Sequence, residues 1–134
     1  MRLYAKIGIS IRMGNNRKIV AVLNDLMFTV KIQEAAKRAG LQTVFVKSQQ
    51  HALDQAKQNP AVIILDLNYA EAVPLETIEK IKADNESSKV SLLGYVSHVQ
   101  ADLKHAAQEK GCDTVIARSA FSQNLPRILS RYAG

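Results

Sequence analysis

The stretch Ala61–Leu67 reads AVIILDL and is the most hydrophobic segment of the chain. Its apolar residues follow one another without alternating with polar ones, and Pro60 precedes them. Short, unbroken apolar runs that are rich in β-branched residues are typical of strands buried on both faces, as in parallel sheets. We therefore expect Ala61–Leu67 to be the central strand of a sheet, with Asp66 close to its carboxyl end.

Four other segments have the character of strands, two before this one along the chain and two after it. They combine β-branched or aromatic residues with a low content of charge, which favours strands over helices at this length. The four segments are Lys18–Leu23 (KIVAVL), Gln42–Lys47 (QTVFVK), Val90–Val96 (VSLLGYV) and Thr114–Ala117 (TVIA).

The segments between and after the strands carry apolar residues at helical spacing. After the first strand, such a stripe ends just before Gly40, where the C-cap of a helix belongs. This stripe consists of Phe28, Ile32, Ala35, Ala36 and Ala39. The other predicted helices are Gln50–Gln58, one that begins at Pro74, Ala101–Lys110 followed by Gly111, and a last helix that carries Leu125, Ile128 and Leu129, with Pro126 near its first turn.

Strands and helices alternate strictly in this pattern, with five of each expected. Right-handed crossover connections between such strands produce a parallel sheet with helices on both faces. The predicted fold class is therefore a doubly wound α/β domain. We find no internal repeat, no low-complexity tract and no linker, so residues 17–134 are expected to form one domain.

Composition narrows the range of possible functions. The 134 residues are 47% hydrophobic and 22% charged, which is typical of a globular domain. Its longest aliphatic stretch is too short to span a bilayer, and we expect no membrane association. A single cysteine, Cys112, excludes an intrachain disulfide and fits a reducing, cytoplasmic location.

The net charge of +6 comes mainly from the N-terminal region. Five basic residues and no acidic residue lie in residues 1–18: Arg2, Lys6, Arg12, Arg17 and Lys18. A nucleic-acid-binding protein is expected to show a basic face within its fold, so we expect no nucleic-acid partner.

Residues 1–16 are expected to form an extension outside the domain. In its middle, Ala5, Ile7, Ile9 and Ile11 alternate with polar residues or glycine, which is the period of a half-buried strand. Two interpretations remain open. The extension is an artefact of the assigned start, with Met13 as a second start and residues 1–12 not native, or it pairs with a sheet edge of its own or another chain.

Polar side chains cluster where the predicted strands end. Open α/β sheets bind ligands beyond the carboxyl ends of their strands, so these residues are candidates for a site. They are Leu23, Asn24 and Asp25 after the first strand, Asp66 and Asn68 at the third, Val96, Ser97 and His98 at the fourth, and Arg118 and Ser119 at the end of the fifth.

At these residues the sequence resembles the CheY-like receiver domain of bacterial response regulators. The resemblance covers residues 17 to 132 and is carried by IVAVLND, VIILDLN and AAQEKGCDTVIARSAF. It implies a flavodoxin-like sheet with strand order 2-1-3-4-5. It also implies phosphoryl transfer from a histidine kinase to Asp66, with Mg²⁺ held by acidic residues after the first strand.

The chain departs from the receiver pattern at most of the remaining pocket positions. Leu23 and Asn24 stand where the family has two acidic residues, and Asn24 offers only a neutral oxygen to Mg²⁺. Val96 replaces a hydroxyl residue, although Ser97 is adjacent. The remaining departures are Arg118 in place of lysine and Ser119 in place of proline.

These departures lead to expectations for individual side chains. We expect Arg118 to pair with Asp66 or with a phosphate, and Asp25 to face elsewhere unless the strand bulges. The cofactor prediction is none, or Mg²⁺ bound weakly by Asp66 and Asn24. Without the hydroxyl that Val96 replaces, the usual switch after the fourth strand is expected to be impaired.

Other reactive residues have plain structural interpretations. His51 and His105 are expected to be exposed, and no third metal ligand accompanies His98 and His105. We expect Cys112 to be buried and inert. Two aromatic residues are expected to act in packing: Tyr95 on the fourth strand, and Phe121 between the last helix and the sheet.

The main functional hypothesis is a stand-alone pseudo-receiver that is not an enzyme. It would act by phosphorylation-independent contact with a protein partner, a histidine kinase or an effector, through the last helix, the edge of the fifth strand and the Gly94–Val99 loop. A homodimer is expected to use the face of the last two strands or the N-terminal strand.

Two alternatives stay open. The first is an atypical response regulator phosphorylated on Asp66, in which Asn24 and the backbone at Asn68 help to hold Mg²⁺, Arg118 neutralises charge and Ser97 supplies the hydroxyl. The second is a small-molecule-binding flavodoxin-like domain, which rests on fold analogy alone.

Overall fold

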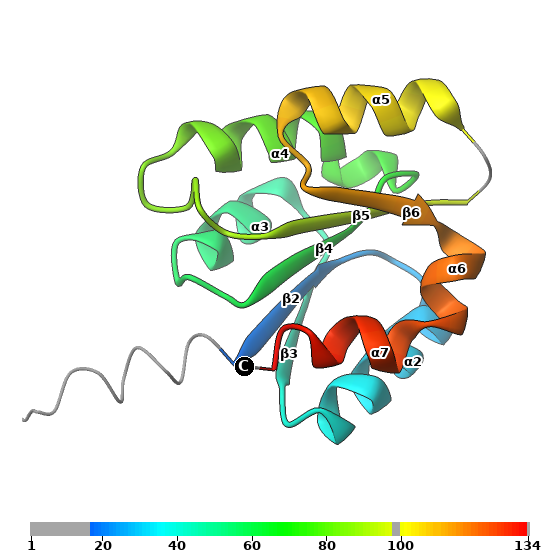
Figure 1. Ribbon diagram of the computed structural model, residues 1–134. Coiled ribbons are helices and arrows are strands. Elements are labelled where there is room, and N and C mark those ends of the chain that lie inside the picture. The colour runs from blue at the N-terminus through cyan, green and yellow to red at the C-terminus, as the bar shows by residue number, and fades with distance from the viewer. Residues whose placement is uncertain (1–16, 98–99, 134) are drawn as a thin grey trace, which may run out of the picture.

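A computed structural model describes residues 17–97 and 100–133 of the chain. Five parallel strands form one sheet in the order β3-β2-β4-β5-β6 (Figure 1). This is the order 2-1-3-4-5 along the chain, as predicted. The strands are β2 (Lys18–Val22), β3 (Gln42–Val46), β4 (Val62–Asp66), β5 (Leu92–Val96) and β6 (Thr114–Ala117).

Strand β4 occupies the middle of the sheet, between β2 and β5. Its first four residues are buried, in agreement with the unbroken apolar run in the sequence. Asp66, its last residue, lies opposite Tyr95 of β5 in the parallel register. The central strand therefore places one partly buried carboxyl group at the edge where all the strands end.

Helices cover both faces of the sheet (Figure 1). On one face, α3, α4 and α5 enclose a core that contains Val20, Ile63 and Leu65. On the other, α2, α6 and α7 enclose a core that contains Ile19, Ile64 and Phe121. The helices are α2 (Leu26–Arg38), α3 (Gln49–Ala56), α4 (Pro74–Ala83), α5 (Ala101–Lys110), α6 (Arg118–Gln123) and α7 (Leu125–Ser130), with a 3₁₀ turn η1 (Ala70–Ala72) after β4.

Glycine ends two of the helices, as the sequence predicts. Gly40 follows the C-cap of α2 with φ of 77°, and Gly111 is the C-cap of α5 with φ of 115°. Residues with a side chain rarely adopt this left-handed conformation, so glycine is favoured where a helix must stop and turn back.

The C-terminal region differs from the prediction of one helix. Two short helices, α6 and α7, follow β6, so strict alternation with five helices was wrong. The break falls at Asn124, two residues before Pro126, which lies in the first turn of α7. Proline lacks the backbone N–H that a continuous helix needs at this point. Arg118 and Ser119 begin α6 instead of ending the fifth strand.

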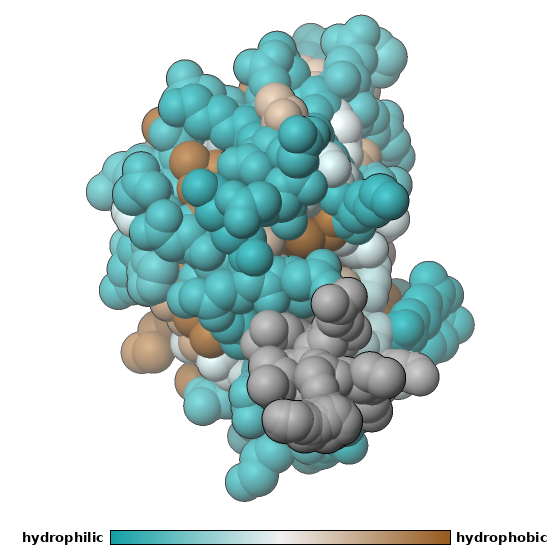
Figure 2. Space-filling view, turned by 90° about the vertical axis from the view of Figure 1, so that its left-hand side faces the viewer, coloured by the Kyte–Doolittle hydropathy of each residue, from teal (hydrophilic) through white to brown (hydrophobic). Residues whose placement is uncertain are grey.

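Several expectations lie outside the described residues. They concern the extension 1–16 and the histidine at position 98. Among the residues that the structure describes, no helix is long and apolar enough to cross a membrane. The face shown in Figure 2 is covered mainly by hydrophilic residues, and apolar residues show only in patches between them.

Candidate functional site

Three charged residues gather at the carboxyl end of the sheet. Asp25 precedes α2, Asp66 is the last residue of β4, and Arg118 is the first residue of α6. The topology brings them together because parallel strands all end at the same edge. The charges of Arg118 and Asp25 both act on the carboxyl group of Asp66.

Arg118 forms an ion pair with Asp25, from its Nη2 to the Oδ2 of the carboxylate. The other carboxylate oxygen of Asp25 accepts the backbone N–H of Phe28 at 3.1 Å and so caps α2. The N–H of Phe28 and the guanidinium of Arg118 hold the pKa of Asp25 below its usual value. The guanidinium carbon also lies 4.5 Å from the centre of the Phe28 ring, within the range of cation–π contacts.

This ion pair corrects two of the sequence-based expectations. Arg118 was expected to pair with Asp66 or with a phosphate, and Asp25 was expected to face elsewhere unless the strand bulges. The prediction failed because Asp25 is the N-cap of α2, with an extended backbone (φ −139°, ψ 110°), and its side chain folds back over the helix end toward Arg118. An aspartate directly before an apolar helical segment is a recognised N-cap signal, so the sequence did indicate the capping role of Asp25, although not its pairing with Arg118.

The carboxyl group of Asp66 accepts the backbone N–H of Asn68 at its Oδ1, at 2.9 Å. Burial raises its pKa and outweighs the Asn68 N–H and the charge of Arg118, which both lower it; the charge of Asp25 adds a smaller increase. Ionising a partly buried carboxyl group that lacks a full counter-charge is costly, because burial removes the water that would stabilise the charge. Asp66 therefore takes up a proton more readily than an exposed aspartate does.

The side chain of Asn68 joins the ends of two neighbouring strands. Its Oδ1 accepts hydrogen bonds from the backbone N–H of Ser97 at 2.8 Å and from the Ser97 hydroxyl at 3.1 Å. Its Nδ2 donates to Oε1 of Gln100 at 2.9 Å. The hydroxyl of Ser97 is thus engaged with Asn68 and does not bind the Asp66 carboxylate.

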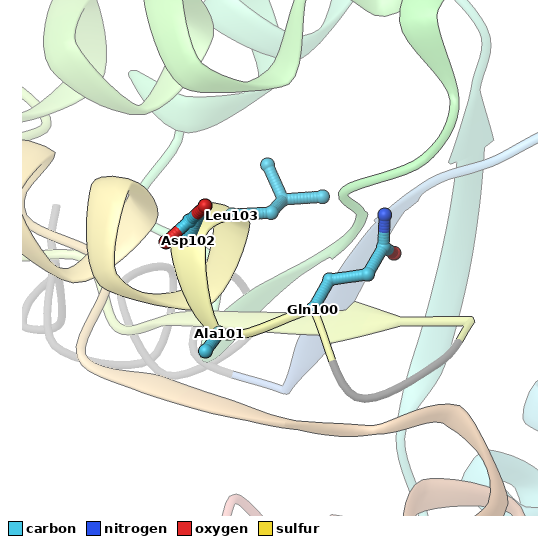
Figure 3. A pocket seen from close by; sticks show the side chains of 4 residues that line it. All are labelled: Gln100, Ala101, Asp102 and Leu103. Carbon is cyan, nitrogen blue, oxygen red and sulfur yellow. The ribbon is translucent and has the colours of Figure 1, made fainter.

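A hollow of about 430 Å³ adjoins this network at the start of α5. It is lined by Gln100, Ala101, Asp102 and Leu103, and Figure 3 shows the side chains of Gln100 and Leu103 on the same side of the helix. Residues 98–99, which precede Gln100 in the sequence, are outside the described part of the chain. We therefore assign no ligand to it.

The side chains after the first strand do not provide the ligands of a high-affinity Mg²⁺ site. Leu23 is only 2% exposed and belongs to the core beneath α2, whereas Asn24 is exposed. Asp25 is already bound to Arg118. No group of three or more acidic, histidine or cysteine side chains that could hold a metal exists within residues 17–97 and 100–133. Mg²⁺ prefers carboxylates and octahedral geometry, which these residues do not supply.

Three stacked aromatic rings lie below the ion pair. The centre of the Tyr95 ring is 5.2 Å from that of Phe28 and 5.1 Å from that of Phe121. All three side chains are buried, which fits the packing roles predicted for Tyr95 and Phe121. Burial and the neighbouring carboxyl of Asp66 raise the pKa of Tyr95. Its hydroxyl has no hydrogen-bond partner among the described residues.

The remaining predictions for single residues agree with the structure. His51 and His105 are exposed. Cys112 is buried, and burial raises the pKa of its thiol to about 11, which makes it unreactive at neutral pH. Val96, in place of a hydroxyl residue, is buried as well.

Sequence reasoning missed an apolar patch on the first turns of α2, which we call the α2 patch. It consists of Leu26, Met27 and Val30, which are 81%, 68% and 46% exposed. Isolated exposed apolar residues are common, but three neighbours on one helix end are more informative. The helical stripe predicted only the buried face of α2. The residues Leu26, Met27 and Phe28 at the helix start contain more apolar side chains than that face can bury, and this surplus was a signal for the patch.

Comparisons with known proteins place these observations in context. No protein-family model and no curated protein matches the chain. Solved structures do match. A response regulator from Hahella chejuensis has a TM-score of 0.78 and 19% identity, over 87% of this chain and 94% of that one.

Two further solved structures match this chain with similar TM-scores, identities and coverage. The phosphorylated cyanobacterial phytochrome response regulator RcpA has a TM-score of 0.73 and 22% identity, with 86% of this chain and 89% of that one covered. The receiver domain of a sensor histidine kinase from Pseudomonas aeruginosa, with a coordinated magnesium ion, has a TM-score of 0.74 and 19% identity, with 88% and 98% covered. With its strand order and layers, this chain has the CheY-like fold of the receiver domains of response regulators.

Proposed function

We propose that this chain is a pseudo-receiver, a docking module of two-component signalling that acts by protein contact without phosphoryl transfer. Its partner is a histidine kinase or an effector protein, and the chain itself is not an enzyme. The observation that carries the proposal is the ion pair between Arg118 and Asp25.

The ion pair puts a permanent cation into the pocket. Phosphoryl transfer to a carboxylate needs a positive charge that neutralises the incoming group, and receivers use a metal held by acidic residues. Here the guanidinium is held by Asp25 and the Phe28 ring, while Leu23 is buried where a metal ligand would be needed. Arg118 therefore neutralises Asp25 and leaves Asp66 as the one carboxylate of the three-residue cluster that is free to bind a cation, so the pocket has little capacity to recruit Mg²⁺.

The hydrogen bonds of Asn68 support the same proposal. The Ser97 hydroxyl donates to the side chain of Asn68, and the side-chain amide of Asn68 donates to Gln100. These hydrogen bonds join the ends of β4 and β5 without a phosphate. A hydroxyl that must follow a phosphoryl group would have to leave this partner first. The arrangement favours one fixed conformation at the carboxyl end of the sheet.

The α2 patch gives the proposed module a surface for contact. Leu26 and Met27 lie on the first turn of α2, directly after the Asp25 that Arg118 holds. The ion pair thus fixes the helix end that presents the patch.

Intact-protein mass spectrometry after incubation with acetyl phosphate and Mg²⁺ tests the proposal. We expect no phosphate adduct on the parent chain under conditions that label a conventional receiver domain, which serves as the positive control. A stoichiometric adduct that is lost in Asp66→Ala would refute the proposal. A thermal melt of each sample verifies that the protein tested is folded.

An alternative function has one observation in its favour. Asp66 is retained at the end of β4, with the Asn68 N–H on its carboxylate and the charge of Arg118 nearby. This arrangement would suit an atypical response regulator phosphorylated on Asp66, with Ser97 as the substitute hydroxyl. Under this alternative, Arg118→Ala reduces an adduct that the parent chain forms, whereas under our proposal neither chain forms one.

A further inference from the structure

A basic surface lies where β2 begins and α2 ends, and we call it the basic end. It consists of Arg17, Lys37 and Arg38, all of them exposed. Arg17 donates a hydrogen bond from its Nη2 to the backbone carbonyl of Gly40 at 2.9 Å, and Lys37 and Arg38 are the last two residues of α2. The turn at Gly40 therefore brings the three cations to the amino end of the sheet.

The cations of the basic end have no carboxylate partner. Within the described part of the chain, none of the three forms an ion pair, although Glu34 lies one turn before Lys37 and Arg38 on α2. The helix dipole favours cations in the last turn of a helix, which gives Lys37 and Arg38 a local role. It does not account for Arg17, which precedes a strand. The positive charge of this end therefore exceeds what the helix end uses.

The sequence concentrates the net charge in the same region. Residues 1–40 contain eight basic and two acidic residues, whereas residues 41–134 contain ten of each. The whole net charge of +6 thus belongs to the first 40 residues. One of their two acidic residues, Asp25, is already paired with Arg118. An anionic partner is therefore attracted toward the basic end and not toward the rest of the molecule.

Residues 1–16 join the domain at Arg17, next to the basic end. They combine basic residues with aliphatic and aromatic ones and contain no acidic residue. The basic residues are Arg2, Lys6 and Arg12, and the apolar ones include Leu3, Tyr4, Ile7, Ile9 and Ile11. An arm that binds nucleic acid by charge needs no aliphatic side chains, whereas segments that lie on membranes combine the two kinds of residue. This composition favours a lipid surface as the anionic partner.

From these observations we infer that the chain associates with the surface of a membrane that contains anionic lipids. Ile7, Ile9 and Ile11 insert into the interfacial layer, and the basic end lies against the headgroups. An apolar segment or a basic surface alone binds membranes only marginally, and the combination binds firmly. This association needs no spanning segment, so the expectation of no membrane association, which rested on the lack of one, is replaced. The inference goes beyond the proposed function and uses neither Asp66 nor Arg118.

Co-sedimentation of the full chain with lipid vesicles tests the inference. The probes are vesicles of phosphatidylcholine alone and vesicles of equal parts phosphatidylcholine and phosphatidylglycerol. We expect the chain to bind the anionic vesicles about tenfold more tightly or better, because each basic residue near the surface is attracted by the lipid charge. A thermal melt verifies that every variant tested is folded.

A matched pair of charge variants locates the contact. Lys37→Gln, Arg38→Gln removes two charges from the basic end and should weaken binding to anionic vesicles about tenfold. Lys47→Gln, Lys104→Gln removes the same charge at exposed positions after β3 and in α5, toward the carboxyl end of the sheet, and should change binding by no more than about twofold. Equal losses in the two variants would overturn the inference, because binding would then follow the net charge alone.

A second pair of variants tests the apolar contribution. Ile7→Ser, Ile11→Ser should weaken binding about tenfold or more, since both side chains lose their burial in the lipid layer. Ile7→Leu, Ile11→Leu keeps the apolar area and should bind as the parent does. Unchanged binding of the serine variant would overturn the inference, as would failure of the parent to bind anionic vesicles. Binding of a random double-stranded DNA fragment in place of the vesicles would assign the basic end to nucleic acid and overturn it as well.

Discussion

The hydroxyl of Tyr95 is fully buried and has no hydrogen-bond partner among the described residues. A buried polar group without a partner costs about 1–3 kcal/mol. We therefore expect Tyr95→Phe to raise the free energy of unfolding by about 1 kcal/mol. Urea denaturation followed by circular dichroism measures this difference.

Tyr69 provides the matched control, because its hydroxyl donates to the backbone carbonyl of Lys47 at 2.8 Å. Tyr69→Phe should lower the free energy of unfolding by about 0.5–1.5 kcal/mol, the usual contribution of one hydrogen bond. The two variants remove the same atom, so opposite signs isolate the effect of the missing partner. A clear loss of stability in Tyr95→Phe would show that its hydroxyl is satisfied after all.

A double-mutant cycle measures the contribution of the ion pair between Arg118 and Asp25. The side chains are 35% and 26% exposed, so solvent screens the pair and a coupling of about 0.5–1 kcal/mol is expected. Asp25→Ala should cost more than Arg118→Ala, since it also removes the N-cap of α2, worth about 1 kcal/mol. Lys31→Ala is the control, because Lys31 also approaches the Phe28 ring, at 6.0 Å. A coupling free energy of zero would contradict the prediction that the ion pair between Arg118 and Asp25 stabilises the fold.

At the scale of the element, β5 depends on one glycine. A Cβ atom at Gly94 would lie 2.9 Å from Cδ1 of Leu67, which is buried and cannot move aside freely. Gly94→Ala should therefore destabilise the protein by about 1–3 kcal/mol, as overpacking usually does. Adding Leu67→Ala should recover part of this clash, so the two losses will not add in urea denaturation. Strict additivity would contradict the contact.

The elements show why the sequence predicted the fold well. Each strand is a short apolar run, and each of the first four helices has a glycine, proline or cap signal at one end, so local rules and topology agree. The last helix was misjudged because RSAFSQ has too few periodic residues to indicate α6. The ion-pair partner of Arg118 was misjudged for another reason: it depends on how one side chain folds back from a helix end, which periodicity does not encode.

At the scale of the whole molecule, the pKa values of two carboxyl groups shift in opposite directions on folding, and this makes the free energy of unfolding depend on pH. The lowered pKa of Asp25 means that the unfolded chain binds its proton more tightly, so this contribution to stability is lost as the pH falls below the unfolded value. The raised pKa of Asp66 means that the folded chain binds its proton more tightly, so stability is gained as the pH falls through the folded value. On acidification the gain from Asp66 therefore comes first, above the ordinary aspartate pKa of 3.8, and the loss from Asp25 follows below it.

Asp66→Asn separates these effects, because it keeps the size of the side chain and removes its charge. We expect the variant to be more stable than the parent at pH 7, where the parent must hold an ionised, partly buried carboxylate. The advantage should shrink as the pH falls, since the parent then takes up the proton. Asp54→Asn, at an exposed helical position, is the matched control for the loss of one carboxylate. The measurement is the free energy of unfolding of parent and variant from pH 7 downward. An advantage of Asp66→Asn that grows on acidification would contradict the prediction. It would mean that the protein stabilises Asp66 as a carboxylate, as a phosphoryl acceptor with a bound cation would.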